Sequence, residues 1–451
     1  MPEAHPPSLK RRNSDDGSIS PPPVKRKQQS TTTSKAVANF FTPVSKKAPE
    51  KISWRVVKDS LLIGKYDDPK DGSASGPTSS KTKVAAFDFD STLIKTASGN
   101  RFGRDATDWQ WWHGSIPQKL RAMSKDGYII AIISNQAGIS LKPNPKSIKS
   151  DQKRLADFKT KVSAVFTQLD LPVSIYAATT RDEYRKPRPG MWREFLEDQD
   201  LEIDDRLDLS ESIFVGDAGG RPAEGGSVKD FSCSDRDFAA NVGLKYHTPE
   251  EFFLGESPKP FIRDFDPSEH TSTATAPLDS NPLVFAKTND LDIVMFCGSP
   301  GAGKSSFYWK HLQELGYERV NQDLLKTRDK CIKAATRFLE QGVPVVIDNT
   351  NAEPEIRAVW IQLARKFDIP IRCVHFTASA KLCEHNDAVR SLNVSSMNPE
   401  KRTMLPKVAF TSFTSRYKEP ALTEGFEDIV KVDFIFEGTP DQKDIWCKYW
   451  I

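Results

Sequence analysis

At residues 84–93 the chain reads VAAFDFDSTL, an apolar run that ends in Asp88 and Asp90. Such a run is typical of a strand buried on both faces of a sheet. Residues two apart on a strand point to the same side, so two acids at a strand end can converge on one site. The alternative is that this aspartate pair caps a following helix.

Comparable apolar runs recur along the chain and alternate with amphipathic stretches of helical character. They lie at residues 84–89, 128–134, 173–178, 212–216, 292–297, 343–347 and 371–376. This alternation predicts βαβ units and parallel sheets. A stretch rich in Pro, Ser and Thr interrupts it at residues 255–282. The sequence therefore predicts the α/β class, with parallel-sheet domains at residues 51–254 and 283–451 and an interdomain connection at 255–282.

Residues 1–50 have a different composition, with eight prolines, eleven Ser or Thr residues and few large apolar side chains. Such a segment cannot bury enough surface to offset its ordering entropy, so we predict a disordered tail. Basic clusters at residues 10–12 and 25–27 have the spacing of a bipartite nuclear localisation signal. They predict a nuclear protein that binds nuclear import receptors through residues 10–27. The alternative is a solvated charge run.

A second feature of the tail is the segment at residues 34–41, which reads SKAVANFF. Phe40 and Phe41 can share one face of a helical turn with the apolar residue before them. The segment resembles the short peptide that binds the DNA sliding clamp, with Ser34 where that motif usually has Gln. The alternative is that the two Phe side chains pack on the rest of the chain.

Overall charge is nearly balanced, at 64 Lys and Arg against 61 Asp and Glu, and the basic excess lies in residues 1–50. The chain is therefore not a wholly basic nucleic-acid binder, and any nucleic acid must bind in local grooves. No apolar run approaches the ~20 residues of a membrane span, and no secretory signal is expected. Six cysteines without a CxxC pair indicate reduced thiols in the cytosol or nucleus and no zinc site.

The aspartate pair is suited to chemistry at phosphorus. One carboxylate can attack the phosphorus atom, while the other protonates the leaving oxygen and later activates water. Crowded carboxylates favour a divalent cation, and oxygen ligands favour Mg²⁺.

Three further segments offer groups for the same site. Ser134 and Asn135 end the run at 128–134 and suit a phosphoryl oxygen, Lys186 supplies a cation, and Asp217 follows the run at 212–216. These groups lie at the carboxyl ends of strands or in nearby loops, where α/β sheets bind ligands.

The order and spacing of these segments resemble the haloacid dehalogenase superfamily of phosphatases. The resemblance implies that Asp88 is the nucleophile and Asp90 the general acid and base. It also implies that Asp217 completes a Mg²⁺ site with Asp88, and that Asp90 reaches the metal through its backbone carbonyl. Ser91 departs from the family, because most members have Gly there, and we expect little disruption from it.

The second predicted domain opens with a loop that matches GxxxxGK[ST]. Its residues are Gly298, Ser299, Pro300, Gly301, Ala302, Gly303, Lys304 and Ser305. Glycines let the backbone of such a loop fold around phosphates, and the next helix begins there. The motif predicts ATP binding, with Lys304 at the β- and γ-phosphates and Ser305 on Mg²⁺.

Three later residues distinguish a kinase from an ATPase. Asp323 follows a short strand and can serve as the base for an acceptor hydroxyl, although it could instead cap a helix. Asp348 resembles the acid that assists Mg²⁺ in P-loop proteins. Arg390 lies in the expected lid and could stabilise charge on the transferred phosphate, or could be a plain surface residue.

The two domains in this order resemble the polynucleotide kinase 3′-phosphatase family of DNA end-processing enzymes. The shared stretches are residues 184–192 (YRKPRPGMW), 214–222 (FVGDAGGRP), 230–235 (DFSCSD), 248–254 (TPEEFFL) and 348–351 (DNTN). The resemblance implies removal of a 3′-phosphate and ATP-dependent phosphorylation of a 5′-hydroxyl at DNA strand-break termini. The forkhead-associated domain of the animal enzymes is not expected before residue 52.

Contacts to DNA are only partly predictable. Arg185, Arg188 and Arg221 flank the phosphatase motifs and could bind backbone phosphates. The alternative function is RNA end healing, although viral RNA-repair enzymes place the kinase first. A scaffold that binds nucleotide without catalysis is disfavoured by the intact acids and P-loop lysine.

Overall fold

The computed structural model describes residues 52–66, 81–142, 144–202, 206–223, 228–271, 285–393 and 397–451, all within one compact unit, Lys51–Ile451. The predictions for residues 10–27 and 34–41 therefore lie outside the described residues, and so does the part of the 255–282 connection from residue 272 onward. Among the residues that are described, no helix has the length and apolar character needed to cross a membrane.

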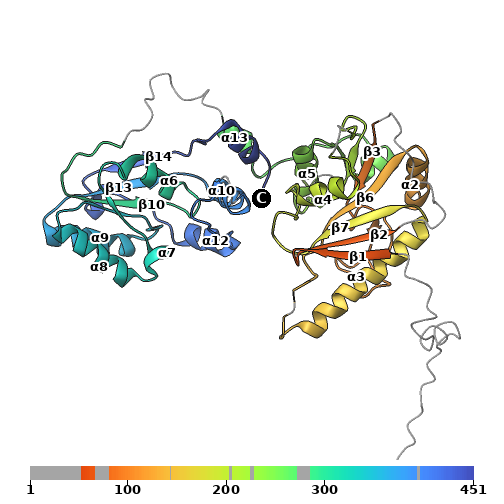
Figure 1. Ribbon diagram of the computed structural model, residues 1–451, viewed down its shortest axis with the longest axis horizontal. Helices are drawn as coiled ribbons and strands as arrows, with labels where there is room; N and C mark the ends of the chain where they lie inside the picture. The colour runs from red at the N-terminus through yellow and green to blue at the C-terminus, as the bar shows by residue number, and fades with distance from the viewer. Residues whose placement is uncertain are drawn as a thin grey trace, which may run out of the picture. The chain divides into compact units, whose positions relative to one another are not determined.

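In the described chain, the first sheet has seven strands in the order β1-β2-β7-β6-β3-β8-β9 (Figure 1). They are β1 (Ile52–Val57), β2 (Leu61–Tyr66), β3 (Lys83–Phe87), β6 (Tyr128–Asn135), β7 (Val173–Ala178), β8 (Ile213–Val215) and β9 (Lys245–His247). Strands β3 and β6 to β9 are parallel, but β2 is antiparallel to both β1 and β7. The predicted α/β fold is confirmed, and the sheet is mixed because a hairpin adds two antiparallel strands at one edge.

The hairpin turn explains why the sequence did not reveal these two strands. Lys58 and Asp59 both have positive φ, and the Ser60 amide donates to the Val57 carbonyl at 3.1 Å. Two central residues with positive φ make the tight turn that suits the strand twist. That turn is usually marked by Asn-Gly or Asp-Gly, and here the signal is absent.

Helices cover both faces of this sheet because successive strand residues point in opposite directions. Ala85 and Phe87 of β3 pack with α2 (Ile116–Lys125) and α3 (Ile148–Leu169). Val84 and Ala86 pack in a second core with α4 (Gly190–Asp198) and α5 (Ser234–Val242). The carboxyl ends of β3, β6 and β8 are thereby fixed between two rigid layers.

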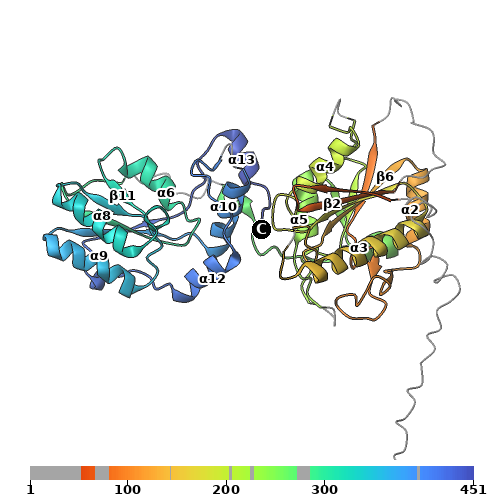
Figure 2. The same cartoon turned by 60° about the horizontal axis from the view of Figure 1, so that its bottom comes forward.

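The second sheet is parallel, as predicted, with the order β11-β12-β10-β13-β14. Its strands are β10 (Ile293–Cys297), β11 (Glu318–Val320), β12 (Val345–Ile347), β13 (Ile371–Phe376) and β14 (Ile429–Val432). One core joins it to α8 (Arg328–Glu340) and α9 (Pro354–Phe367), which Figure 2 shows together. The opposite core includes α6 (Lys304–Phe307) and α12 (Lys407–Arg416).

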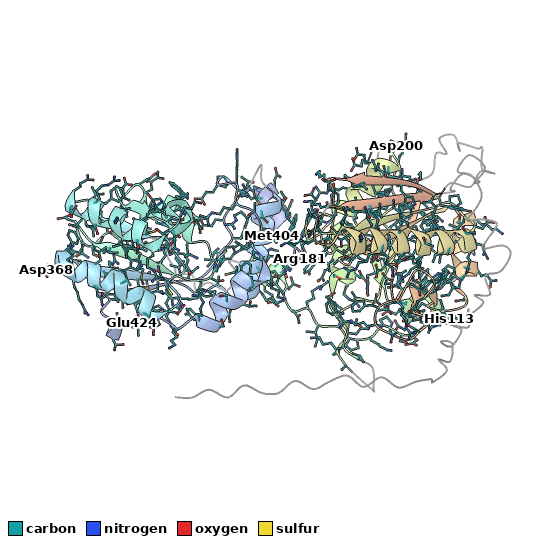
Figure 3. All side chains as sticks on the ribbon, turned by 90° about the horizontal axis from the view of Figure 1, so that it is seen from below. His113, Arg181, Asp200, Asp368, Met404 and Glu424 are labelled. Carbon is teal, nitrogen blue, oxygen red and sulfur yellow. The ribbon has the colours of Figure 1, made fainter. Side chains whose placement is uncertain are left out.

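The remaining described elements are short or peripheral. They are β4 (Ile94–Lys95), β5 (Gln110–Trp111), α7 (Gln322–Leu325), α10 (Ala380–Leu392), α13 (Pro440–Trp446), π-helical segments at Glu250–Leu254 and Tyr308–Leu312, and 3-10 turns at Pro267–His270 and Leu422–Glu424. Arg357 of α9 is fully buried and donates to Glu424 at 2.8 and 2.6 Å, which ties α9 to the turn before β14. Glu424 is labelled in Figure 3.

Candidate active sites

Asp88 directly follows β3, and its amide donates to the Val215 carbonyl of β8 at 2.8 Å. Asp90 accepts a hydrogen bond from Gln136 Nε2 at 2.6 Å. The chain continues from Asp90 into β4, so the aspartate pair does not cap a helix. Ser91 has φ +61°, a left-handed conformation that glycine adopts at lower cost, which accounts physically for the usual Gly.

Protein atoms packed around the site and the charge of Asp88 raise the pKa of Asp90 above its ordinary value. Its side chain is exposed on one side to solvent. The raised pKa favours a proton on Asp90, as a general acid requires.

Lys186 lies between two carboxylates, with Nζ 2.8 Å from both Asp88 Oδ1 and Asp235 Oδ1. Its side chain is 2% exposed. Burial by itself would lower the pKa of the Lys186 ammonium, but Asp235 and Asp88 together raise it above its ordinary value. Lys186, the predicted phosphate-binding cation, is therefore held in its charged form beside Asp88, the predicted nucleophile.

Asp235 is a residue of this site that the sequence reasoning missed. It lies in the first turn of α5, and its Oδ2 accepts from the Ala218 amide at 3.0 Å. Burial, opposed in part by Lys186, raises the pKa of Asp235 to about 6. The segment at 230–235 is one of the stretches that resemble the family, but a lone aspartate at a helix start gives no chemical signal in the sequence.

Oxygen atoms of Asp88, Asp217 and Asp235 lie within 4.8 Å of one another. An all-carboxylate set of this size fits a hard divalent cation such as Mg²⁺. Burial and the charges of Asp88 and Asp235 raise the pKa of Asp217 well above its ordinary value, so a bound cation would offset a real electrostatic cost here.

Ser134 and Asn135 end β6 beside this cluster. Ser134 is buried, and its Oγ accepts from Gln136 Nε2 at 3.0 Å. Asn135 instead binds the Lys186 backbone, accepting from its amide at 2.9 Å and donating to its carbonyl at 3.2 Å. The side-chain amide of Asn135 therefore positions the lysine loop, and phosphate binding by Asn135 stays a prediction.

The three arginines predicted to bind nucleic acid differ in burial and in their hydrogen-bond partners. Arg188 is 3% exposed and donates to the Arg181 and Asp182 carbonyls at 2.9 and 2.7 Å, and burial lowers its pKa to about 10. Arg221 is paired with Asp230 and Glu250. The structure therefore contradicts the prediction that Arg188 binds nucleic acid. The charge of Arg221 is already neutralised by its two carboxylate partners.

Arg185 is the exception, because its Nη1 has no hydrogen-bond partner among the described residues. Burial lowers the pKa of this guanidinium. It stands next to Lys186 in the sequence, and its contact with nucleic acid stays a prediction.

In the second domain, residues 300–305 of the loop and α6 line a cleft of about 1770 Å³. Gly301 has φ +80°, and a Cβ there would collide with the Cys383 carbonyl, so the loop requires glycine. Lys304 Nζ donates to the carbonyls of Gly298 and Ser299 at 3.0 and 2.7 Å. Burial lowers the pKa of the Lys304 ammonium.

Asp323 lies in α7 on the rim of this cleft, with its side chain 75% exposed. The cap of α7 is Asn321, whose Oδ1 accepts from the Asp323 and Leu324 amides at 2.9 and 3.3 Å. The alternative that Asp323 caps the helix is therefore wrong, and its carboxylate takes no part in the cap. Its neighbour is Arg402, at 3.3 Å.

Asp348 follows β12, and its Oδ2 accepts from Ser305 Oγ at 3.0 Å. The cation beside them is Arg319, which the sequence reasoning did not single out. Arg390 of α10 lines the cleft, as predicted for a lid residue, and donates to Asp387.

These two sites and sheets define a class: a haloacid-dehalogenase-like phosphatase followed by a P-loop kinase. A family model described as "Polynucleotide kinase 3 phosphatase" matches residues 83–253, and one described as "AAA domain" matches residues 293–420. A bifunctional polynucleotide phosphatase/kinase of Schizosaccharomyces pombe is 41% identical over 88% of this chain and 88% of its own length. A polynucleotide 3′-phosphatase of Saccharomyces cerevisiae is 29% identical over 38% of this chain and 87% of its own length. The chain belongs to the bifunctional polynucleotide phosphatase/kinase family.

Proposed function

We propose that this enzyme removes 3′-phosphates from DNA termini and uses ATP to phosphorylate 5′-hydroxyl termini, which prepares strand breaks for ligation. The observation that carries the proposal is the pairing, in one chain, of the Asp88–Lys186 ion pair with the P-loop cleft beside Asp323. The two products, a 3′-hydroxyl and a 5′-phosphate, are the ends that a ligase joins.

In the first reaction, Asp88 attacks the phosphorus of the 3′-phosphate and forms an aspartyl-phosphate, while the bond to the 3′-oxygen breaks. Asp90 gives its proton to that oxygen. Asp90 then takes a proton from water, which attacks the aspartyl-phosphate, releases inorganic phosphate and restores Asp88. Lys186, at 2.8 Å from Asp88, neutralises the phosphoryl oxygens throughout.

The residues that would hold Mg²⁺ are Asp88, Asp217 and Asp235, with the backbone carbonyl of Asp90. When bound, the cation offsets the repulsion between these carboxylates and the phosphate. Ser134 supplies a hydroxyl at the end of β6 for a phosphoryl oxygen.

In the second reaction, Asp323 removes the proton of the 5′-hydroxyl, and the resulting oxygen attacks the γ-phosphorus of ATP, with ADP as leaving group. Lys304 and Arg390 place positive charge against the transferred phosphate. Ser305 and Asp348 would hold the Mg²⁺ that accompanies the nucleotide, because their oxygens already meet at 3.0 Å.

DNA is proposed over RNA because the phosphatase precedes the kinase. The decisive assay uses purified protein, ATP and Mg²⁺ on nicked duplexes with 3′-phosphate and 5′-hydroxyl ends, made in matched DNA and RNA forms. We expect a higher kcat/KM on DNA for both activities. A clear preference for RNA would replace this proposal with RNA end healing.

For the tail, we propose nuclear import through residues 10–27 and sliding-clamp binding through residues 34–41. Removal of residues 1–50 should reduce nuclear accumulation while both activities on short oligonucleotides persist. Unchanged import would reject the first proposal. Replacing Phe40 and Phe41 by Ala should weaken capture of the purified clamp, and unchanged capture would reject the second.

A further inference from the structure

Arg319 is placed at the two side chains that are expected to hold a metal ion in the kinase site. It is the middle residue of β11, and its side chain reaches Ser305 of the P-loop. Its Nη2 donates to Ser305 Oγ at 2.8 Å and lies 2.6 Å from Asp348 Oδ2, and its Nε donates to the same oxygen at 2.7 Å.

This contact lies inside the protein and is not an encounter between exposed surface side chains. The side chains of Arg319 and Asp348 are 7% and 2% exposed. Burial alone would lower the pKa of the Arg319 guanidinium, but Asp348 and Glu400 raise it above its ordinary value. A fully charged guanidinium therefore neutralises the Asp348 carboxylate inside the protein.

The contact also extends toward the proposed base. Arg319 Nη1 donates to Glu400 Oε1 at 2.7 Å, and Arg402 lies 2.6 Å from Glu400 Oε2. Arg402 in turn lies 3.3 Å from Asp323 Oδ2. Charges thus alternate from Asp348 to Asp323 in one connected chain, so a displacement of Arg319 would loosen the contacts that hold Arg402 at Asp323.

We propose that Arg319 is a positioning residue that competes with the divalent metal for Ser305 and Asp348. Without metal, its guanidinium neutralises Asp348 and keeps the Ser305 hydroxyl oriented. A divalent cation and a guanidinium cannot both contact these oxygens closely, because like charges repel strongly at such distances in a buried site. Metal entry therefore displaces Arg319 into the cleft, where its charge faces the phosphates of the nucleotide.

This inference rests on the proposed nucleotide site, and its test uses no nucleotide, so the two can fail separately. The probe is Mn²⁺, whose free concentration is followed by electron paramagnetic resonance. All variants carry Asp217→Asn, which removes a ligand from the phosphatase cluster and leaves the kinase site as the reporter. The series is Arg319→Met, Arg319→Lys, Asp348→Asn and the double variant Arg319→Met with Asp348→Asn, and the control is Arg337→Met at an exposed arginine of α8.

Arg319→Met should bind Mn²⁺ about tenfold more tightly than the background, as expected for a typical coupling between competing sites. It should also gain more thermal stability from Mn²⁺, because the metal then neutralises a buried and unpaired Asp348. The Mn²⁺ affinity of Arg319→Lys should lie between those of Arg319→Met and the background. In the double variant, Asp348→Asn should abolish the gain in Mn²⁺ affinity. Arg337→Met should bind Mn²⁺ as tightly as the background does. Unchanged Mn²⁺ affinity in folded Arg319→Met overturns the proposal. If that variant does not fold, equal affinity of Arg319→Lys and the background overturns it.

Discussion

Lys186 Nζ lies 2.8 Å from Asp235 Oδ1, and both side chains are 2% exposed. The carboxylate comes from the first turn of α5, whereas the lysine comes from the loop before α4. This buried ion pair therefore holds the phosphate-binding cation in place together with Asp88.

We expect Asp235→Asn to lower phosphatase kcat/KM by about 10- to 100-fold, the range for residues that orient the ligands of a metal site. The amide keeps the shape of the carboxylate but removes its charge, so Lys186 and the metal site lose a partner. Kinase activity of the same preparation should be unchanged, and Asp264→Asn, at an exposed aspartate, serves as control. Full phosphatase activity in Asp235→Asn would show that Asp88 alone positions the lysine.

The proposed division of labour predicts opposite effects at the two sites. Asp88→Asn should reduce 3′-phosphate release by at least about 10³-fold, since loss of a nucleophile removes the covalent route, and should spare the kinase. Lys304→Ala should do the reverse, because Lys304 lines the P-loop cleft of the second domain. Both activities are measured on one nicked substrate. Persistent phosphate release by Asp88→Asn would reject its assignment as nucleophile.

The two neighbouring arginines Arg185 and Arg188 should respond differently to alanine. Arg185→Ala should reduce the slope of log affinity against log salt for a single-stranded oligonucleotide by about one, as expected for loss of one phosphate contact. Arg188→Ala should leave that slope unchanged but lower the melting temperature, because its guanidinium binds carbonyls of its own loop. Equal slopes for Arg185→Ala and the unmodified protein would remove Arg185 from the nucleic-acid surface.

His385 predicts acid sensitivity of the second domain. Its ring is fully buried, Nε2 lies 2.9 Å from the Trp446 carbonyl, and burial with the nearby His270 lowers its pKa to about 4. An unfolded histidine has a pKa of about 6.5, so between these values the unfolded chain binds a proton that the folded chain does not. The stability present above pH 6.5 should therefore fall as pH decreases toward 4, by up to about 3 kcal/mol.

Urea unfolding of the second domain at a series of pH values between 7.5 and 4.5 measures this loss. His385→Gln, which can still donate to the carbonyl, should flatten the pH profile. The exposed His113, labelled in Figure 3, provides the control substitution His113→Gln. Identical profiles for His385→Gln and the unmodified protein would contradict the prediction.

Much of the fold was predictable because its strands are continuous apolar runs. The runs at 128–134 and 371–376 became β6 and β13 with nearly the same bounds. The hairpin of β1 and β2 was not predicted, because its turn at Lys58 and Asp59 lacks the usual glycine. Because this turn was not recognised, the two antiparallel strands that make the sheet mixed were not predicted.

The motif residues Asp88, Lys304 and Ser305 could be identified without coordinates, because their chemistry depends on short spacings along one strand and loop. Asp235 and Arg319 could not, because each acts through a partner distant in sequence: Lys186 is 49 residues from Asp235, and Asp348 is 29 residues from Arg319. Ion pairs of this kind form only when packing of helices and strands brings the charges into a buried site, where the low polarity makes the pairing matter. For the same reason Arg188, which resembles a surface cation in the sequence, proved to be a buried structural residue.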